Sequence, residues 1–129
     1  MSKKILLIDD DLFIRELYME VLRDEGFEVD TGVDGEEGLA KLKKGGYILV
    51  LLDIVMPKLD GLAVLDALTK ISPLEKNGPV VLLTNLSQET IQRDFRSNRA
   101  ASYLVKGELT PGQLVENVKK ILANTSLTY

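Results

Sequence analysis

The sequence predicts an α/β protein in which helices cover both faces of a parallel β-sheet. Residues 48–52 form a continuous apolar run without helical or alternating periodicity, which is typical of a strand buried on both faces. Similar short runs alternate along the 129 residues with stretches of helical periodicity, which predicts parallel strands joined by right-handed crossovers. Most of the strand-like runs end in a polar or charged residue, as expected where an α/β sheet carries its functional groups.

The N-terminal part of the chain contains three strand-like runs and two connecting helices. Apolar residues three and four positions apart indicate a first helix over 12–25, which Gly26 ends. Asp34, with Glu37 three residues later, forms a capping box that starts a second helix to about Lys44. The strands are predicted over residues 4–8, 27–31 and 48–52.

The C-terminal part repeats the alternation. Asp60 is the expected N-cap of a helix that runs to about Ile71, and the proline-containing loop 72–79 follows it. Thr110-Pro111, with Gln113, starts the last helix. The remaining elements are strands over 80–83 and 102–105 and, between them, a weakly amphipathic helix over 88–98.

The composition excludes several classes of function. The chain has no cysteine and no histidine, which excludes disulfides, thiol catalysis, histidine-dependent hydrolysis and phosphohistidine formation on this chain. A net charge of −4 without a Lys/Arg cluster argues against a nucleic-acid surface. No apolar run approaches the ~20 residues that span a membrane, and the N-terminus lacks a signal-peptide core. We therefore expect a cytoplasmic protein of one domain.

Five polar residues follow four of the predicted strands. Asp9 and Asp10 follow the first strand and Asp53 the third, while Thr84 and Lys106 follow the fourth and fifth. Each has an ordinary structural interpretation, because Asp and Thr often cap helices and Lys is commonly a surface amine. Since parallel strands place their carboxyl ends at one edge of the sheet, we expect all five side chains to converge there.

Four motifs together resemble the receiver domain of bacterial response regulators: LLIDDD, LLDIVMPKLDG, VVLLTN and YLVK, in this order. The resemblance covers essentially the whole chain. It implies a flavodoxin-like (βα)5 fold with a five-stranded parallel sheet in the order 2-1-3-4-5. We expect residues 1–124 to form the receiver domain and 125–129 a short tail without an output domain. The chain would then be a stand-alone receiver or part of a longer regulator.

The resemblance also implies a phosphorylation site on the third strand. Asp53 resembles the phosphoryl acceptor, and Asp10 and Asp53 resemble carboxylate ligands of Mg²⁺, with Mn²⁺ as an alternative. The backbone carbonyl of Val55 would be a third ligand, and Asp9 would contact the ion through water. Three neighbouring carboxylates repel one another, and a hard divalent cation relieves that repulsion.

Three further residues take their expected roles from the resemblance. Thr84 and Lys106 would hold the phosphoryl oxygens, and the Lys106 ammonium would neutralise charge during transfer. Tyr103 resembles an aromatic switch residue. We expect phosphorylation to draw the Thr84 hydroxyl inward and Tyr103 into the vacated space, which would change a protein-interaction face.

The phosphoryl group must come from outside the chain, because the chain has no histidine. The implied donor is a partner histidine kinase or His-phosphotransfer protein, or a small acyl phosphate. We expect Phe13 to be exposed and to belong to the surface that docks the kinase. We expect the downstream target to be an unknown protein, and we expect no binding to nucleic acid or membrane. No enzymatic activity is expected beyond metal-dependent self-phosphorylation and self-dephosphorylation.

Some positions depart from the pattern of the family. Gly107 stands where a proline usually follows the lysine, so we expect a trans Lys106–Gly107 bond, with a positive φ at Gly107 aiming the lysine. Asn85 replaces a small residue and would crowd the phosphodonor or add a hydrogen bond. Val55 and Leu86 are apolar, so we expect them to exclude water from phospho-Asp53 and to slow its hydrolysis.

Two other functions fit the same fold class. A flavodoxin-type FMN carrier would need a Ser/Thr/Gly-rich phosphate loop, and the segment after the first strand, DDDLF, has the wrong charge. A degenerate receiver would act as a phosphorylation-independent interaction module. Retention of all five strand-end residues argues against it, and labelling with acetyl phosphate and Mg²⁺ would separate both alternatives from a functional receiver.

Overall fold

A five-stranded parallel sheet forms the centre of the computed structural model, which describes residues 3–85 and 102–126. The strands lie in the order β2-β1-β3-β4-β5, and all four neighbouring pairs are parallel. The predicted class and strand order are therefore confirmed. The strands are β1 (Lys4–Ile8), β2 (Glu28–Gly32), β3 (Leu49–Asp53), β4 (Val80–Thr84) and β5 (Ser102–Val105).

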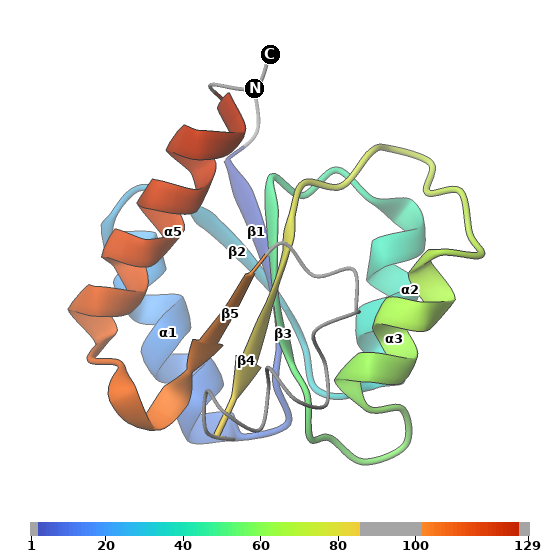
Figure 1. Ribbon diagram of the computed structural model, residues 1–129, viewed down its shortest axis with the longest axis horizontal. Helices are drawn as coiled ribbons and strands as arrows, with labels where there is room; N and C mark the ends of the chain where they lie inside the picture. The colour runs from blue at the N-terminus through green and yellow to red at the C-terminus, as the bar shows by residue number, and fades with distance from the viewer. Residues whose placement is uncertain (1–2, 86–101, 127–129) are drawn as a thin grey trace.

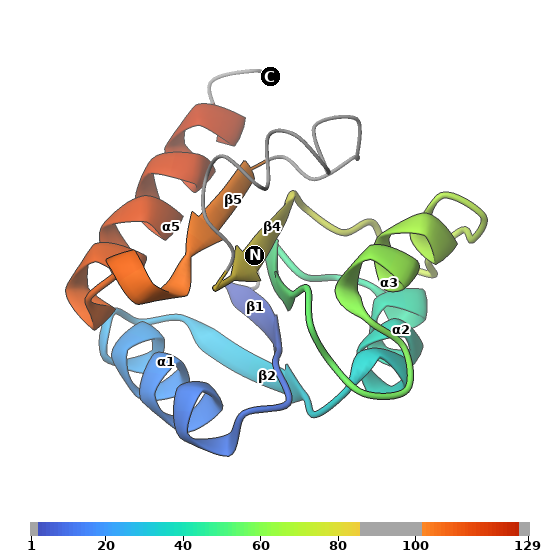
Figure 2. The same ribbon diagram turned by 60° about the horizontal axis from the view of Figure 1, so that its bottom comes forward.

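Helices cover both faces of this sheet (Figures 1 and 2). On one face, α1 (Leu12–Asp24) contacts α5 (Pro111–Ser126), and on the other α2 (Gly35–Lys44) contacts α3 (Gly61–Leu68). A short 3-10 helix, η1 (Lys106–Glu108), connects β5 to the segment before α5. The helix predicted over 88–98 lies outside the described residues.

The core consists of two apolar layers separated by the sheet. Because side chains alternate along a strand, β1 sends Ile5 and Leu7 into the layer beneath α1 and α5, and Leu6 and Ile8 into the layer beneath α2 and α3. Every residue of β3 is buried, which explains the continuous apolar run in the sequence. The sheet is thereby fixed between two packed layers, and the carboxyl end of β3 has a fixed position.

Side-chain caps begin the helices, at Asp34, Asp60 and Thr110 as the sequence predicted, and also at Asp11. The carboxylates of Asp11, Asp34 and Asp60 each accept a backbone N–H three residues further on, at 3.1, 2.9 and 2.8 Å. Before α5, the Thr110 hydroxyl and the Gln113 amide oxygen each accept the other residue's backbone N–H, as in a capping box.

The third helix is shorter than predicted, since it ends at Leu68 and not near Ile71. Pro73 disfavours helical geometry in the residue before it. The loop also runs back to α2, where the N–H groups of residues 74 and 75 donate to the carbonyls of Lys43 and Lys44 at 2.9 Å. The chain must leave the helix early to make these bonds, and a sequence stripe that continues to Ile71 does not reveal this.

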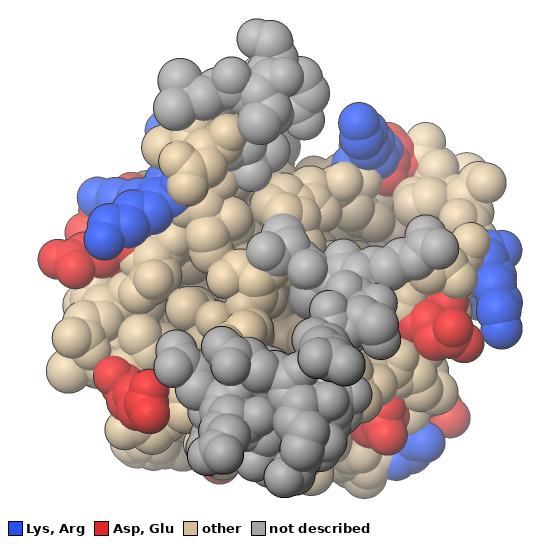
Figure 3. All heavy atoms as spheres, viewed as in Figure 1, with Lys and Arg blue, Asp and Glu red and all other residues tan. Residues whose placement is uncertain are grey.

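Charged side chains of both signs lie at the edges of the face seen in Figure 3, over α5 on one side and over α2 and α3 on the other.

Within residues 3–85 and 102–126, no helix combines the length and the apolar character needed to cross a membrane.

Candidate functional site: an acidic pocket at the carboxyl edge of the sheet

The strand register brings the predicted residues to one edge of the sheet. Ile8 of β1 pairs with Leu52 of β3, so that Asp9 and Asp53 follow neighbouring positions on adjacent strands. An open pocket of about 350 Å³ lies at this edge. Its lining comes from the ends of β1, β3, β4 and β5: Asp9, Asp10, Asp11, Asp53, Val55, Asn85 and Lys106.

Three carboxylates form the acidic centre of the pocket. Oxygen atoms of Asp9, Asp10 and Asp53 all lie within 4.8 Å of one another. Asp9 is completely buried and Asp53 is 5% exposed, whereas Asp10 is exposed to solvent. Carboxylate oxygens at this spacing are the hard ligands that Mg²⁺ prefers, and the exposed Asp10 leaves one side accessible. The residues present therefore fit a divalent-cation site.

Lys106 supplies the positive charge inside the pocket. Its Nζ lies 2.5 Å from Asp9 Oδ2 and 3.3 Å from Asp53 Oδ1, and its side chain is 8% exposed. The sequence analysis expects this amine to hold the phosphoryl oxygens on Asp53, and therefore to lie close to Asp53. In the structure it contacts both acids and approaches Asp9 more closely, and it supplies a counter-charge to two buried carboxylates.

Asp9 is fixed on every side. Its Oδ1 accepts the backbone N–H of Asp11 at 2.9 Å, and its carbonyl accepts Nη1 of Arg15 at 2.8 Å. Its own N–H donates to the carbonyl of Gly32 at 3.1 Å. Sequence reasoning missed Arg15, because a single arginine on the first turns of an amphipathic helix has the same pattern as an ordinary surface residue.

Burial and charge shift the acid–base properties of the pocket. Burial raises the pKa of Asp53 to about 7, with the Asp9 charge acting in the same direction and Lys106 in the opposite one. Burial by itself lowers the pKa of Lys106. The hydrogen bond and charge of Asp9, followed by those of Asp53, outweigh this effect and leave the pKa above its usual value. The ammonium is therefore stable at neutral pH, while Asp53 titrates there.

We call the segment between β3 and α3, residues 54–60, the acceptor loop. It closes tightly at its base: a Cβ on Gly61 would lie 2.2 Å from the carbonyl oxygen of Asp53, so only glycine allows α3 to begin there. Val55, on this loop, is 69% exposed and lines the pocket. Asn85, which directly follows β4, is exposed and also lines it. Leu86 lies outside the described residues.

The two candidate switch residues occupy neighbouring strands. Thr84 ends β4 beside Val105, is 1% exposed, and is not among the described lining residues of the pocket. Tyr103 is half-buried in β5, pairs with Leu82, and packs against the apolar layer beneath α2 and α3. The structure thus places both residues on adjoining strands close to the acidic edge.

The bond between Lys106 and Gly107 is trans, as predicted. The prediction of a positive φ at Gly107 is wrong, because positive φ among glycines is found at Gly26, Gly45 and Gly46. Gly107 instead belongs to η1, whose turn geometry carries the chain away from β5 with a negative φ. The lysine is directed into the pocket by its ion pairs and not by an unusual glycine conformation.

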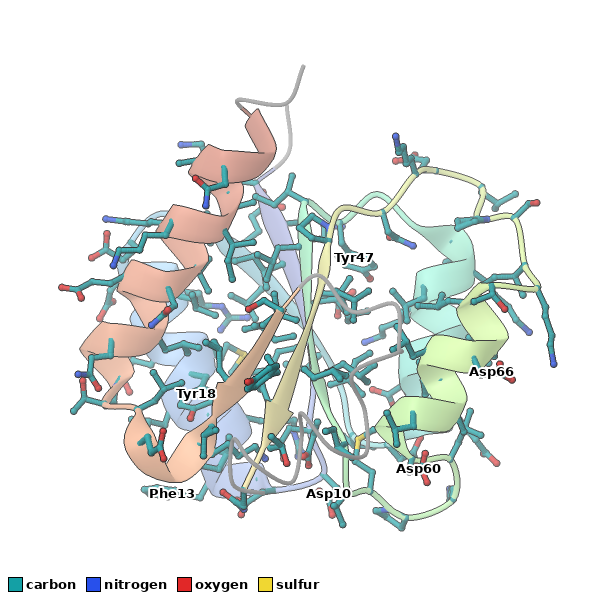
Figure 4. The ribbon with its side chains drawn as sticks, in the orientation of Figure 1. Asp10, Phe13, Tyr18, Tyr47, Asp60 and Asp66 are labelled. Atoms are coloured by element: carbon teal, nitrogen blue, oxygen red, sulfur yellow. The ribbon has the colours of Figure 1, made fainter. Side chains whose placement is uncertain are left out.

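Phe13 is 72% exposed on α1, in agreement with the prediction. Figure 4 shows Phe13 and Asp10 at the same end of the sheet, with Tyr47 toward the opposite end. An exposed aromatic ring thus lies at the same end of the sheet as the acidic pocket.

Comparison with known proteins gives the same picture. Residues 5–119 match the family model described as response regulator receiver domain. The chain is 36% identical over 122 residues to the chemotaxis protein CheY of Treponema pallidum, covering 92% of this chain and 82% of that protein. It is 37% identical to a CpxR homologue of Haemophilus influenzae, a transcriptional regulatory protein, covering 95% of this chain and 52% of that protein. The chain thus spans only about half the length of that regulator.

A solved structure shows the same similarity in three dimensions. The response regulator TrrA of Thermotoga maritima, solved in complex with Mg²⁺-BeF, is 42% identical with a TM-score of 0.78, covering 93% of this chain and 99% of that one. Sequence motifs, strand order and the matched length agree, and the chain belongs to the response regulator receiver domain family of two-component systems.

Proposed function

We propose that this chain is a phosphorylation-dependent signalling receiver that accepts a phosphoryl group on Asp53. The observation that carries the proposal is the pocket itself: Asp53 lies at an open edge of the sheet, with two more carboxylates within 4.8 Å and an ammonium at 3.3 Å. A buried carboxylate beside a cationic side chain is suited to nucleophilic attack on a group whose charge must be neutralised.

Mg²⁺ would be held by Asp10, Asp53 and the backbone carbonyl of Val55, with Asp9 contacting it through water. When bound, it supplies positive charge that offsets both the carboxylates and the phosphoryl oxygens. Mn²⁺, which accepts the same oxygen ligands, would serve as an alternative. Asp9 is fixed by Arg15 and Lys106 and can therefore orient water without moving.

Transfer requires the ionised form of Asp53. One carboxylate oxygen forms a bond to phosphorus, while the bond from phosphorus to the donor nitrogen or oxygen breaks and its electron pair leaves with the donor. Lys106 is stably protonated and its Nζ lies 3.3 Å from Asp53 Oδ1, where its positive charge can offset the negative charge of the phosphoryl oxygens. Thr84 would donate its hydroxyl to another of these oxygens.

The donor is a partner histidine kinase or His-phosphotransfer protein, since the chain has no histidine. The exposed Phe13 belongs to the docking surface for this partner, because it lies at the same end of the sheet as the pocket and exposes a large apolar ring to solvent. After transfer, Thr84 moves inward and Tyr103 follows, which changes the surface around β4, β5 and α5 that a downstream protein recognises.

The test is labelling of purified protein by acetyl phosphate and Mg²⁺, followed by intact-protein mass measurement. Wild type should gain one phosphoryl group, and the Asp53→Asn variant should gain none. Asp66→Asn is the matched control, because it removes an acid that is 70% exposed on α3. Absence of labelling in wild type, or labelling that persists in Asp53→Asn, would contradict the proposal and favour a phosphorylation-independent module.

A further inference from the structure

The acceptor loop contains a strained turn. Lys58 has a φ of 66°, and it is the one non-glycine residue with positive φ in the described part of the chain. The N–H of Leu59 donates to the carbonyl of Pro57 at 2.8 Å, which closes a three-residue turn around Lys58. A γ-turn with positive φ at its centre is the rarer and more strained of the two forms. Such a turn persists only where the surrounding structure holds it.

Two contacts with the start of α2 hold this turn. Lys58 Nζ lies 3.4 Å from Asp34 Oδ2. At the next residue of each partner, a Cβ on Gly35 would lie 1.7 Å from the Leu59 carbonyl oxygen, so the loop backbone rests directly on the first residue of the helix. The loop is therefore fixed at its base by α3 and at its tip by α2.

The Asp34 carboxylate serves both structures. Its Oδ1 accepts the N–H of Glu37 at 2.9 Å and caps α2, while its Oδ2 faces Lys58. The Asp34 side chain is 13% exposed, whereas that of Lys58 is 60% exposed. The largely buried Asp34 carboxylate thus holds the solvent-exposed Lys58 side chain. The geometry of the start of α2 therefore determines where the tip of the loop can lie.

We propose that Lys58 and Asp34 are positioning residues, which hold the acceptor loop against α2 so that the Val55 backbone carbonyl stays in place for the divalent cation. The proposal rests on the function proposed above, in which that carbonyl is a ligand. Val55 lies three residues before Lys58, between the buried side chains of Ile54 and Met56. A loop with a buried start and a fixed tip cannot shift the intervening backbone freely.

Charge alone makes the opposite prediction for one of the two residues. Removing the Lys58 ammonium makes the neighbourhood more negative, so simple electrostatics predicts tighter Mg²⁺ binding. Removing the Asp34 charge should weaken binding on the same argument. Under the positioning role, both changes weaken it, because each breaks the same tether. The two explanations therefore differ in the sign of the Lys58 effect.

The experiment is calorimetric titration of MgCl2 into wild type, Lys58→Gln, Asp34→Asn and the double variant. Glutamine keeps a side chain at the strained position without the charge, and asparagine keeps the cap of α2. We expect each single variant to weaken the Mg²⁺ Kd by about tenfold, the lower end of what loss of an outer support of a metal ligand costs. The double variant should bind no more weakly than either single one, because the tether can be broken only once.

Two controls separate positioning from other effects. Lys70→Gln removes a lysine that is 74% exposed and pairs with Asp66 on α3, and it should leave the Kd unchanged. Lys58→Arg should restore wild-type affinity. Urea unfolding of each variant without metal should show nearly unchanged stability, since an ion pair whose lysine is 60% exposed is screened by solvent and contributes little to it.

Tighter or unchanged Mg²⁺ binding in Lys58→Gln would overturn the positioning role while leaving the proposed function intact. A loss of affinity that tracks a loss of stability across the variants would also overturn it. If wild type bound no Mg²⁺, the proposed function and this inference would fail together.

Discussion

Replacing Asp53 with asparagine should stabilise the metal-free protein at alkaline pH. Burial, aided by Asp9, raises the pKa of Asp53 from an ordinary 3.8 to about 7. Between these two values, the folded protein keeps a proton that the unfolded chain has lost, so stability falls as the pH rises through this window. Above pH 7 the folded protein carries the whole destabilisation caused by ionised Asp53, and below pH 4 this destabilisation is absent. Asparagine has nearly the same shape and carries no charge.

The size of the effect follows from the pKa. The increase is about three, and each pKa unit corresponds to about 1.4 kcal/mol, so the charged Asp53 costs the apo fold at most about 4 kcal/mol. The Asp53→Asn variant should therefore have a higher free energy of unfolding than wild type by most of this amount at pH 8, and by almost none of it at pH 4. With an ordinary urea dependence for a chain of this size, the unfolding midpoint at pH 8 should rise by about 1–2 M.

Urea unfolding at pH 4, 6 and 8 in EDTA measures this dependence, with Asp66→Asn as the control for an exposed acid. Added Mg²⁺ should stabilise wild type in proportion to its occupancy and leave Asp53→Asn nearly unchanged. A stability difference that does not vary with pH, or an Asp53→Asn variant less stable at pH 8, would refute the argument. Either result would mean that Lys106 already compensates the Asp53 charge fully.

Four further predictions concern other parts of the pocket. Asp10→Asn should raise the melting temperature in EDTA by less than Asp53→Asn does, because Asp10 is exposed. It should also abolish the stabilisation by Mg²⁺. An unchanged melting temperature would mean that the repulsion among the three carboxylates is already relieved. Phe13→Ala should slow transfer from a phosphohistidine donor but not from acetyl phosphate, and equal slowing of both would exclude a docking role. Lys106→Met should cost about 3 kcal/mol in urea unfolding at pH 8, since it leaves a buried carboxylate unpaired, and a neutral result would contradict that pairing. Phosphorylated wild type should lose its phosphoryl group slowly by hydrolysis. At fixed Mg²⁺, the double variant Val55→Asn/Leu86→Glu should lose it about tenfold faster, because the polar side chains place the attacking water better. Equal rates of hydrolysis would indicate that another group, with Asn85 as the first candidate, positions the water.

The sequence predicted the convergence of the site because that convergence depends on few variables. Once 4–8, 48–52, 80–83 and 102–105 are recognised as parallel strands, the residues that follow them must lie at one edge, whatever the details of packing. The caps at Asp34 and Asp60 were equally predictable, because an N-cap depends on its own side chain and a backbone three residues away. Local rules and strand direction account for these features.

Contacts that depend on distances of a few ångströms between remote segments were not predictable in this way. Lys106 lies 97 residues from Asp9 in the sequence, and no local pattern indicates which of the two buried carboxylates it approaches more closely. The strained φ at Lys58 is imposed by α2 and has no signature in the MPKLDG segment itself. The end of α3 is likewise decided by hydrogen bonds from its loop to α2.

The ion pair between Lys106 and Asp9 connects the end of β5 to the end of β1 across the carboxyl edge of the sheet. Lys106 follows β5, at one edge of the sheet, and reaches Asp9 at the end of β1 past the ends of β4 and β3. Asp53 lies beside this connection, at 3.3 Å. A phosphoryl group on Asp53 would bring additional oxygens to the same ammonium and compete with Asp9 for it. Tyr103 lies on β5, three residues before Lys106, and Lys106 directly follows that strand, so we expect a displacement of the Lys106 backbone to shift the strand that carries the candidate switch residue.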